Sequence, residues 1–114
     1  HLQQRTPEQC RWDIESHGCN PAIQVSDASR WLDAAQHGLE QIWGRRAILM
    51  GCGGSIPVVG SFQTILGAES LLIGFGLDDD RVHSPNEKFD LSCFHGGTRS
   101  HAAVIAAFAQ AIER

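Results

Sequence analysis

Two short apolar runs, each followed by glycine, constrain the possible folds of this chain more than any other feature. Residues 47–50 (AILM) lead into Gly51-Cys52-Gly53-Gly54, and residues 71–75 (LLIGF) lead into Gly76. Short apolar runs bounded by turn residues are typical of buried strands. Between them, residues 57–66 have the pattern of a helix that ends at Gly67. The sequence therefore predicts a strand at 47–50, a helix, and a second strand at 70–75.

Two further helices are predicted on either side of this unit. Residues 27–43 carry apolar side chains at helical spacing, with Ser26 or Asp27 as the cap and Gly44 as the end. Thr98 is expected to cap a last helix, whose apolar face holds Val104, Ile105, Phe108 and Ile112. Alternating helices and strands predict an α/β fold: a partial mixed or parallel sheet with flanking helices. Because two strands make a poor sheet, further strands are expected in chain that is not present here.

The glycine-rich turn after the first predicted strand is a candidate anion site. A strand that passes through Gly53 and Gly54 into a helix leaves backbone N–H groups free at the positive end of the helix dipole. Ser55 either caps the helix or donates its hydroxyl to a ligand. The plain alternative is that the two glycines only make a tight turn that needs positive φ.

The segment after the second predicted strand, residues 78–87 (DDDRVHSPNE), holds the other candidate. His83 lies in a loop that follows a strand, which is where open α/β sheets place their active sites. A lone histidine is more often a surface or locally hydrogen-bonded residue than a ligand. We expect the bland role for the other histidines considered, which are His17, His37, His95 and His101.

The charged residues around His83 have two interpretations each. Consecutive carboxylates at 78–80 point in different directions, so a solvated loop is favoured over a metal cluster. Glu87 pairs with Lys88 or Arg81 on the surface, or it orients the His83 loop by a hydrogen bond behind the ligand.

Composition excludes several classes of function. The chain has 114 residues, one domain's worth, with a net charge of −4 that argues against a nucleic-acid surface. No apolar run approaches the roughly 20 residues of a membrane span. The four cysteines include no Cys-x-x-Cys pair, so we interpret them as free thiols in a reducing cytoplasm. No signal peptide is recognised, although a chain that begins with His1 leaves a missing N-terminal segment open.

Two motifs together make the sequence resemble a known family. The run Gly53-Gly54-Ser55-Ile56-Pro57, followed 28 positions after Ser55 by His83-Ser84-Pro85-Asn86-Glu87, resembles the M20 metallopeptidases. This group contains carnosinase-like dipeptidases, acetylornithine deacetylases and succinyl-diaminopimelate desuccinylases. The resemblance covers nearly the whole chain and corresponds to the C-terminal part of a family member.

The resemblance implies a domain assignment. Residues 21–114 would be the C-terminal part of a phosphorylase/hydrolase-like zinc-peptidase catalytic domain. Residues 1–20 would end a lid or dimerisation domain, with the alternating stretch 10–16 as its last strand. The parent protein would be a homodimer.

The resemblance also implies a mechanism and a set of site residues. Two metal ions, usually zinc with manganese or cobalt as alternatives, would activate a water that hydrolyses the amide bond of a dipeptide or N-acyl amino acid. His83 would be a metal ligand, with Glu87 behind it. Gly53, Gly54 and Ser55 would bind the carboxylate end of the substrate.

The remaining catalytic groups have no counterpart in this sequence. There is no His-x-Asp and no Glu-Glu, so no catalytic residue is expected in these 114 residues. One histidine is too few ligands for a catalytic zinc. Dipeptidase-like members also carry Arg-Glu where this chain has Gly51 and Cys52. Two hypotheses follow: a fragment of a metal-dependent hydrolase that is inactive alone, or a non-catalytic truncated or pseudo-enzyme segment with a structural or interaction role.

Overall fold

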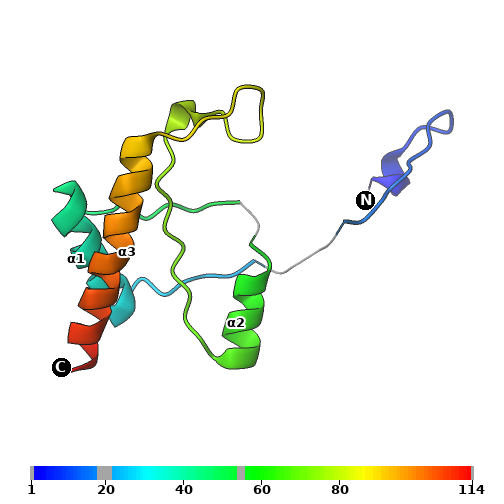
Figure 1. The fold of residues 1–114 in the computed structure, drawn as a ribbon. Helices are drawn as coiled ribbons and strands as arrows, with labels where there is room; N and C mark the ends of the chain where they lie inside the picture. Colours follow the sequence, from blue (N-terminus) through cyan, green and yellow to red (C-terminus); the bar gives the residue numbers. More distant parts are fainter. Residues whose placement is uncertain (1, 18–21, 54–55, 114) are drawn as a thin grey trace.

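Three α-helices dominate the part of the chain that the structure, a computed structural model, describes: residues 2–17, 22–53 and 56–113. Long extended segments connect them (Figure 1). The helices are α1 (Arg30–Trp43), α2 (Val58–Leu66) and α3 (Leu91–Ile112), and two short 3₁₀ helices, η1 (Gln3–Arg5) and η2 (Asp78–Asp80), complete the regular structure of the described residues.

The predicted sheet is wrong, because none of the described residues forms a strand. Residues 47–50, 70–75 and 10–16 are extended or irregular, and the described residues of these segments share no backbone ladder. An apolar run favours extended backbone, but a strand also needs a neighbour about 4.7–4.9 Å away to exchange hydrogen bonds. The sequence pattern cannot show whether a second run comes that close, and the α/β assignment failed at this step.

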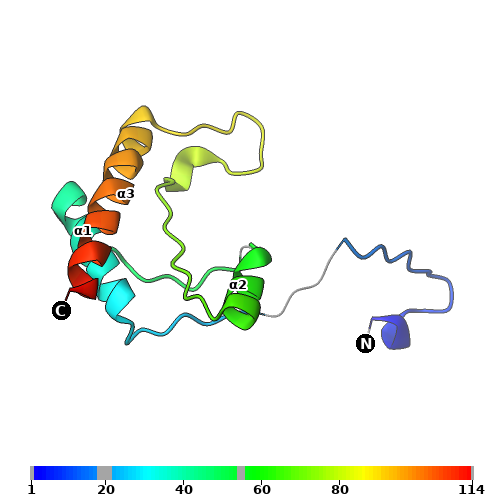
Figure 2. The same cartoon turned by 60° about the horizontal axis from the view of Figure 1, so that its bottom comes forward.

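The core lies between α1 and α3, which run side by side in both ribbon views (Figures 1 and 2). Ala35 and Leu39 of α1 meet Val104 of α3 at its centre. The extended segments add partly buried apolar side chains on top: Ala47, Leu71, Ile73 and Phe75, with Phe108 from α3. Residues 71, 73 and 75 alternate with exposed neighbours, so the segment packs as one face of a strand would, without a partner strand.

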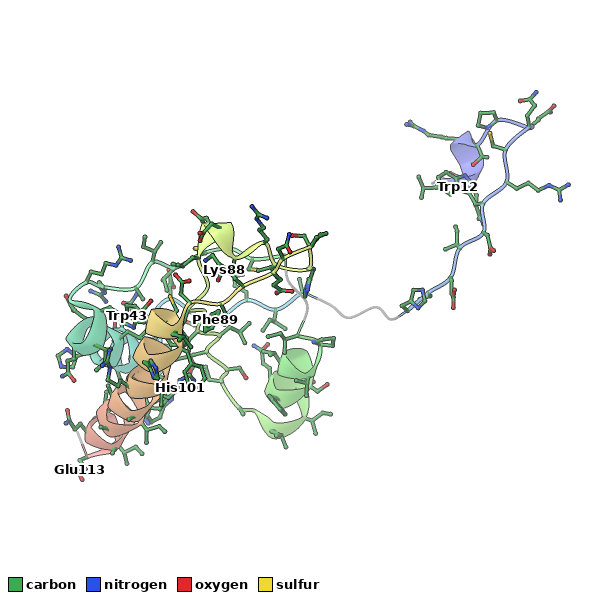
Figure 3. The ribbon with its side chains drawn as sticks, turned by 45° about the horizontal axis from the view of Figure 1, so that its top comes forward. Trp12, Trp43, Lys88, Phe89, His101 and Glu113 are labelled. Atoms are coloured by element: carbon green, nitrogen blue, oxygen red, sulfur yellow. The ribbon has the colours of Figure 1, made fainter. Side chains whose placement is uncertain are left out.

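Trp43 connects the end of α1 to the middle of α3 by a hydrogen bond and by packing. Its indole nitrogen donates a hydrogen bond of 2.8 Å to Oγ of Ser100, which is 1% exposed. Its ring stacks on Phe75 at a centroid distance of 5.9 Å. A Cβ at Gly96 would lie only 2.6 Å from the indole, so the ring fits because residue 96 is glycine. Figure 3 labels Trp43 at the helix pair, to which it belongs as the last residue of α1.

A second set of polar contacts fixes the chain that leaves α1. The guanidinium of Arg46 donates to Oε1 of Gln36 at 2.6 Å and to Asp33 at 3.2 Å. The amide of Gln36, a buried side chain, donates to the carbonyl of Ala47 at 3.2 Å. These bonds satisfy the buried side chain of Gln36 and hold Arg46 and Ala47 against α1.

The helix ends were predicted better than the helix starts. Gly44 and Gly67 end α1 and α2 in left-handed conformation, with φ of 67° and 61°, as predicted. The cap of α1 is Ser29 rather than Ser26 or Asp27. Thr98 lies inside α3 and donates to the carbonyl of Phe94, because the helix begins seven residues earlier, at Leu91.

Residues 2–17 lie apart from the helices in all three figures. Apart from η1 they are irregular, and Trp12 donates its indole N–H to Oγ1 of Thr6 within the same segment. Assignment of residues 1–20 to a lid domain and of 21–114 to a catalytic domain remains a prediction. No helix in the described part of the chain has the length and hydropathy of a membrane span.

Candidate functional site

The loop from Leu77 to Asp90 is built around the carboxylate of Asp80. Asp80 closes η2 and its residue is 2% exposed. One carboxylate oxygen accepts the backbone N–H of Leu77 at 2.7 Å, and the other accepts Nζ of Lys88 at 2.9 Å. The backbone carbonyl of Asp80 also accepts the N–H of Lys88 at 3.0 Å. One residue therefore holds both ends of the loop 81–87.

Lys88, labelled in Figure 3, places its ammonium group among three carboxylates. Its Nζ lies 3.0 Å from Asp79 and 3.4 Å from Asp90, in addition to its bond with Asp80. The N–H of Leu77 and then Lys88 hold the pKa of Asp80 below its ordinary value of 3.8. Hydrogen bonds to Asp80 and Asp79 raise the pKa of Lys88. The pair is therefore fully ionised around neutral pH.

The backbone of the loop is strained where it carries His83. Arg81, His83 and Asn86 all have positive φ, at 54°, 60° and 60°. A left-handed conformation costs a residue other than glycine roughly 1–2 kcal/mol, and such residues persist where their surroundings hold them in place. The carbonyl of Arg81 accepts both the N–H of Ser84, at 3.0 Å, and its hydroxyl, at 2.6 Å. The imidazole of His83 is presented on the surface by this fixed turn.

Glu87 and the other acidic residues do not join His83 in a metal site. Glu87 is exposed and makes no hydrogen bond or ion pair with any described residue. No group of three His, Cys, Asp or Glu side chains in the described part of the chain could hold a metal ion. The residues described here supply His83 as a candidate ligand, and by themselves they do not fit a pair of metal ions.

The glycine turn is only partly described. Gly54 and Ser55, two of the three residues of the predicted anion pocket, lie outside the described residues. Gly53 is exposed, and a Cβ there would meet no atom of the described residues within 4 Å. Pro57 occupies the N-cap of α2, which has no side-chain cap bond.

A groove of about 270 Å³ lies away from these residues. Residues 23–26 form one wall, and Val59, Gln63 and residues 67–70 form the other. None of the described residues that line it is one of the predicted site residues. The groove therefore gives no support to the site predicted from sequence.

The other histidines have local partners or face solvent, as expected. His101 hydrogen-bonds to the carbonyl of Gly97 at 2.8 Å, and His37 to Gln41 at 3.1 Å. His17 lies 3.8 Å from Glu15, and His95 is exposed against the ring of Phe94.

Asp80 and Lys88 are the residues that sequence reasoning missed. The solvated-loop prediction for residues 78–80 holds for Asp78 and Asp79, which are exposed, and fails for Asp80. The available signal for this pair was Lys88, eight positions after Asp80, because a buried carboxylate needs a partner of opposite charge. Residues 81–87 form an irregular loop, in which sequence spacing does not indicate which side chains meet, so the pairing was not recognisable.

Comparison with known proteins identifies related sequences. The family model described as peptidase family M20/M25/M40 matches residues 5–107. A Cys-Gly metallodipeptidase of Saccharomyces cerevisiae is 34% identical over 109 residues, which are 95% of this chain and 22% of the relative. A Beta-Ala-His dipeptidase of Homo sapiens is 32% identical over 93 residues, 82% of this chain and 18% of the relative. The chain thus spans about a fifth of the length of these relatives. No solved structure matches it.

Proposed function

The chain belongs to peptidase family M20/M25/M40, and from this we propose that it is the C-terminal part of a metal-dependent hydrolase that cleaves the amide bond of dipeptides or N-acyl amino acids. The observation that carries the proposal is the 34% identity to a metallodipeptidase over 95% of the chain. Zinc is the metal we propose, two ions per complete site, with manganese or cobalt as alternatives. A homodimeric parent in the cytoplasm completes the proposal.

Exposed apolar surface supports the proposal that the chain is part of a larger protein. α3 has 22 residues, and among Asp, Glu, Lys and Arg it contains only Arg99. Its C-terminal half, residues 102–112, has Gln110 as its one polar side chain, and a helical segment that is apolar on nearly all sides is typical of the interior of a larger protein. Its outer side chains are largely uncovered, with exposures of 73% at Leu91, 67% at Ile105 and 68% at Ile112. The extended segment 47–50 adds Ile48 at 85%.

His83 is the residue we propose as a metal ligand. His83 lies on a turn with three left-handed residues, next to the ion pair between the buried Asp80 and the partly exposed Lys88, and this supports the proposal because such strain collects at functional sites. The described residues supply no further cluster of ligands, so the proposal assigns the other ligands to chain outside these 114 residues. A bound metal pair would polarise the scissile carbonyl and activate water. The role of His83 would be to hold one ion.

Gly53, Gly54 and Ser55 are proposed to bind the carboxylate end of the substrate. Their position in the sequence, ending two residues before the N-cap of α2, supports this because free N–H groups at a helix N-terminus attract anions. Glu87 is proposed to orient the His83 loop from behind the ligand.

The test is the metal content of the complete protein with His83→Ala. Loss of a ligand is expected to reduce bound zinc from two ions per chain toward one. Even partners behind a ligand change metal affinity or activity by 10–100-fold, so activity should fall by more than about 100-fold. Elemental analysis and a dipeptide assay measure both effects.

His37→Ala is the matched control. His37 is an exposed histidine of α1, and Gln41 is its only hydrogen-bond partner among the described residues. It should keep both the metal and the activity. Two ions per chain in both variants would exclude His83 as a ligand.

The second candidate function is a non-catalytic segment with a structural or interaction role. The scarcity of metal-binding groups among the described residues favours it for this polypeptide taken alone. The mass of the expressed gene product distinguishes the two: a product of roughly this chain's 12.4 kDa favours the non-catalytic segment, and a product of the relatives' length favours the hydrolase.

A further inference from the structure

We propose that Asp80 is a positioning residue: its buried carboxylate, through Leu77 and Lys88, fixes the conformation of residues 81–87 that presents His83. The importance of that loop rests on the proposed function, in which His83 holds a metal ion. The geometry that supports the proposal is independent of any metal.

The first step is that Asp80 joins the two ends of the loop. Asp80 and Lys88 are connected twice, by the backbone bond of 3.0 Å from N–H to carbonyl and by the side-chain bond of 2.9 Å from Nζ to carboxylate. The second carboxylate oxygen fixes the residue before η2 through the N–H of Leu77. The seven residues between them, 81–87, are therefore held at both ends by the contact between Asp80 and Lys88.

The second step is that the interior of the loop needs such a fixed point. Arg81, His83 and Asn86 have left-handed backbone, and none is a glycine. Within residues 81–87, all of which the structure describes, the only further hydrogen bonds run from Ser84 to the carbonyl of Arg81. Residues in sparsely populated conformations relax unless the surrounding structure holds them. The contacts that close this loop converge on Asp80.

The third step is that Asp80 differs from its neighbour in the way a positioning role requires. Asp79 also contacts Nζ of Lys88, at 3.0 Å, but its side chain is 74% exposed whereas that of Asp80 is 2% exposed. An exposed ion pair contributes little because water screens it. A buried carboxylate must keep its partners, since burial without them is unfavourable. Its hydrogen bonds, reflected in a lowered pKa, therefore define one loop geometry.

Gly76 gives this carboxylate its space. A Cβ at position 76 would lie 3.3 Å from Oδ2 of Asp80, tighter than ordinary contact. The backbone N–H of the next residue, Leu77, can therefore approach that oxygen closely. The glycine that ends the apolar run 71–75 thus also admits the carboxylate that organises the loop.

The experiment compares Asp80→Asn with Asp79→Asn in the complete, metal-free protein. Each variant removes one negative charge that contacts Lys88, and only Asp80→Asn removes a buried carboxylate. Hydrogen–deuterium exchange of peptides covering residues 81–88 should become at least tenfold faster in Asp80→Asn. It should stay within twofold of wild type in Asp79→Asn. Unchanged exchange in Asp80→Asn, or equal acceleration in both variants, would overturn the proposal.

Zinc affinity provides the readout that a merely structural role would not change. Competition with a chelator should give a dissociation constant 10–100-fold weaker for Asp80→Asn than for Asp79→Asn, the range seen when support behind a metal ligand is lost. Saturating zinc should then restore most of the activity. Faster exchange with an unchanged zinc constant, in a protein whose His83→Ala variant loses metal, would show that Asp80 orders the loop without positioning the ligand.

Two further measurements distinguish a failure of this proposal from a failure of the proposed function. Full metal occupancy in His83→Ala overturns the metal-ligand assignment, and the exchange comparison still decides whether Asp80 holds the loop. If Asp80→Asn does not fold, Lys88→Gln removes the same bond from its more exposed side. Lys88→Gln is expected to accelerate exchange at 81–88 to a similar extent, and wild-type exchange in that variant contradicts the proposal.

Discussion

Gly38 and Gly60 are both glycines inside helices, yet their surroundings differ. A Cβ at Gly38 of α1 would lie 2.9 Å from the backbone nitrogen of Val104 and 3.0 Å from the carbonyl of Ala103. A Cβ at Gly60 of α2 would lie 3.5 Å from Cγ2 of Ile23, which is ordinary contact. Glycine is therefore required by the close approach of α1 and α3 at position 38, and it is only tolerated at position 60.

These surroundings predict opposite effects for the same substitution. Gly38→Ala is expected to lower the free energy of unfolding by about 1–3 kcal/mol, because the added methyl meets backbone that cannot move aside. Gly60→Ala is expected to raise it by about 0.5–1 kcal/mol, because alanine loses less conformational entropy than glycine in a helix. Urea denaturation of both variants measures the difference, and a change of the same sign in both would contradict the packing argument.

At the scale of elements, the start of α1 shows what a capping residue has to do. Ser29 is buried, and its Oγ accepts the N–H groups of Trp31 at 3.1 Å and Leu32 at 3.4 Å. Ser26 bonds instead to the N–H of Ala28 in the preceding turn and is exposed. Ser26, Asp27 and Ser29 are all residue types that cap helices, so composition alone could not choose among them.

Ser29→Ala is therefore expected to lower the free energy of unfolding by about 1 kcal/mol, the usual effect of removing a helix cap. Ser26→Ala should change it by less than about 0.5 kcal/mol, as for other surface substitutions. Denaturation midpoints with helicity followed by circular dichroism provide the measurement. A larger loss in Ser26→Ala would place the functional cap three residues earlier.

The apolar runs were informative about packing and misleading about secondary structure. Residues 71, 73 and 75 do contact the α1–α3 core, as an alternating segment should. Whether such a segment becomes a strand depends on hydrogen bonds to a neighbour, which is a property of the tertiary arrangement and not of the run itself. The helix ends were predictable because Gly44 and Gly67 act through their own backbone.

At the scale of the whole molecule, the features of the site that depend on local sequence were predictable, and those that depend on tertiary arrangement were not. The motif at residues 53–57 and the motif at residues 83–87 were together sufficient to predict the family, which the comparisons confirm. The pairing of Asp80 with Lys88 was beyond the sequence, because it depends on burial and on a turn with three left-handed residues. A motif can be recognised from residues that are close together in the sequence. Burial depends on how residues from elsewhere in the chain pack around a side chain.

The isolated 114-residue chain is expected to be catalytically inactive. Water activation by zinc needs about three protein ligands with an open position, and the described residues contain no group of three candidate ligands. Purified chain with added zinc or cobalt should hydrolyse a panel of dipeptides and N-acetyl amino acids no faster than metal alone. Metal-dependent turnover that a chelator removes, and that His83→Ala also removes, would contradict this expectation. Such turnover would mean that the chain assembles a site its sequence does not show, for example between copies.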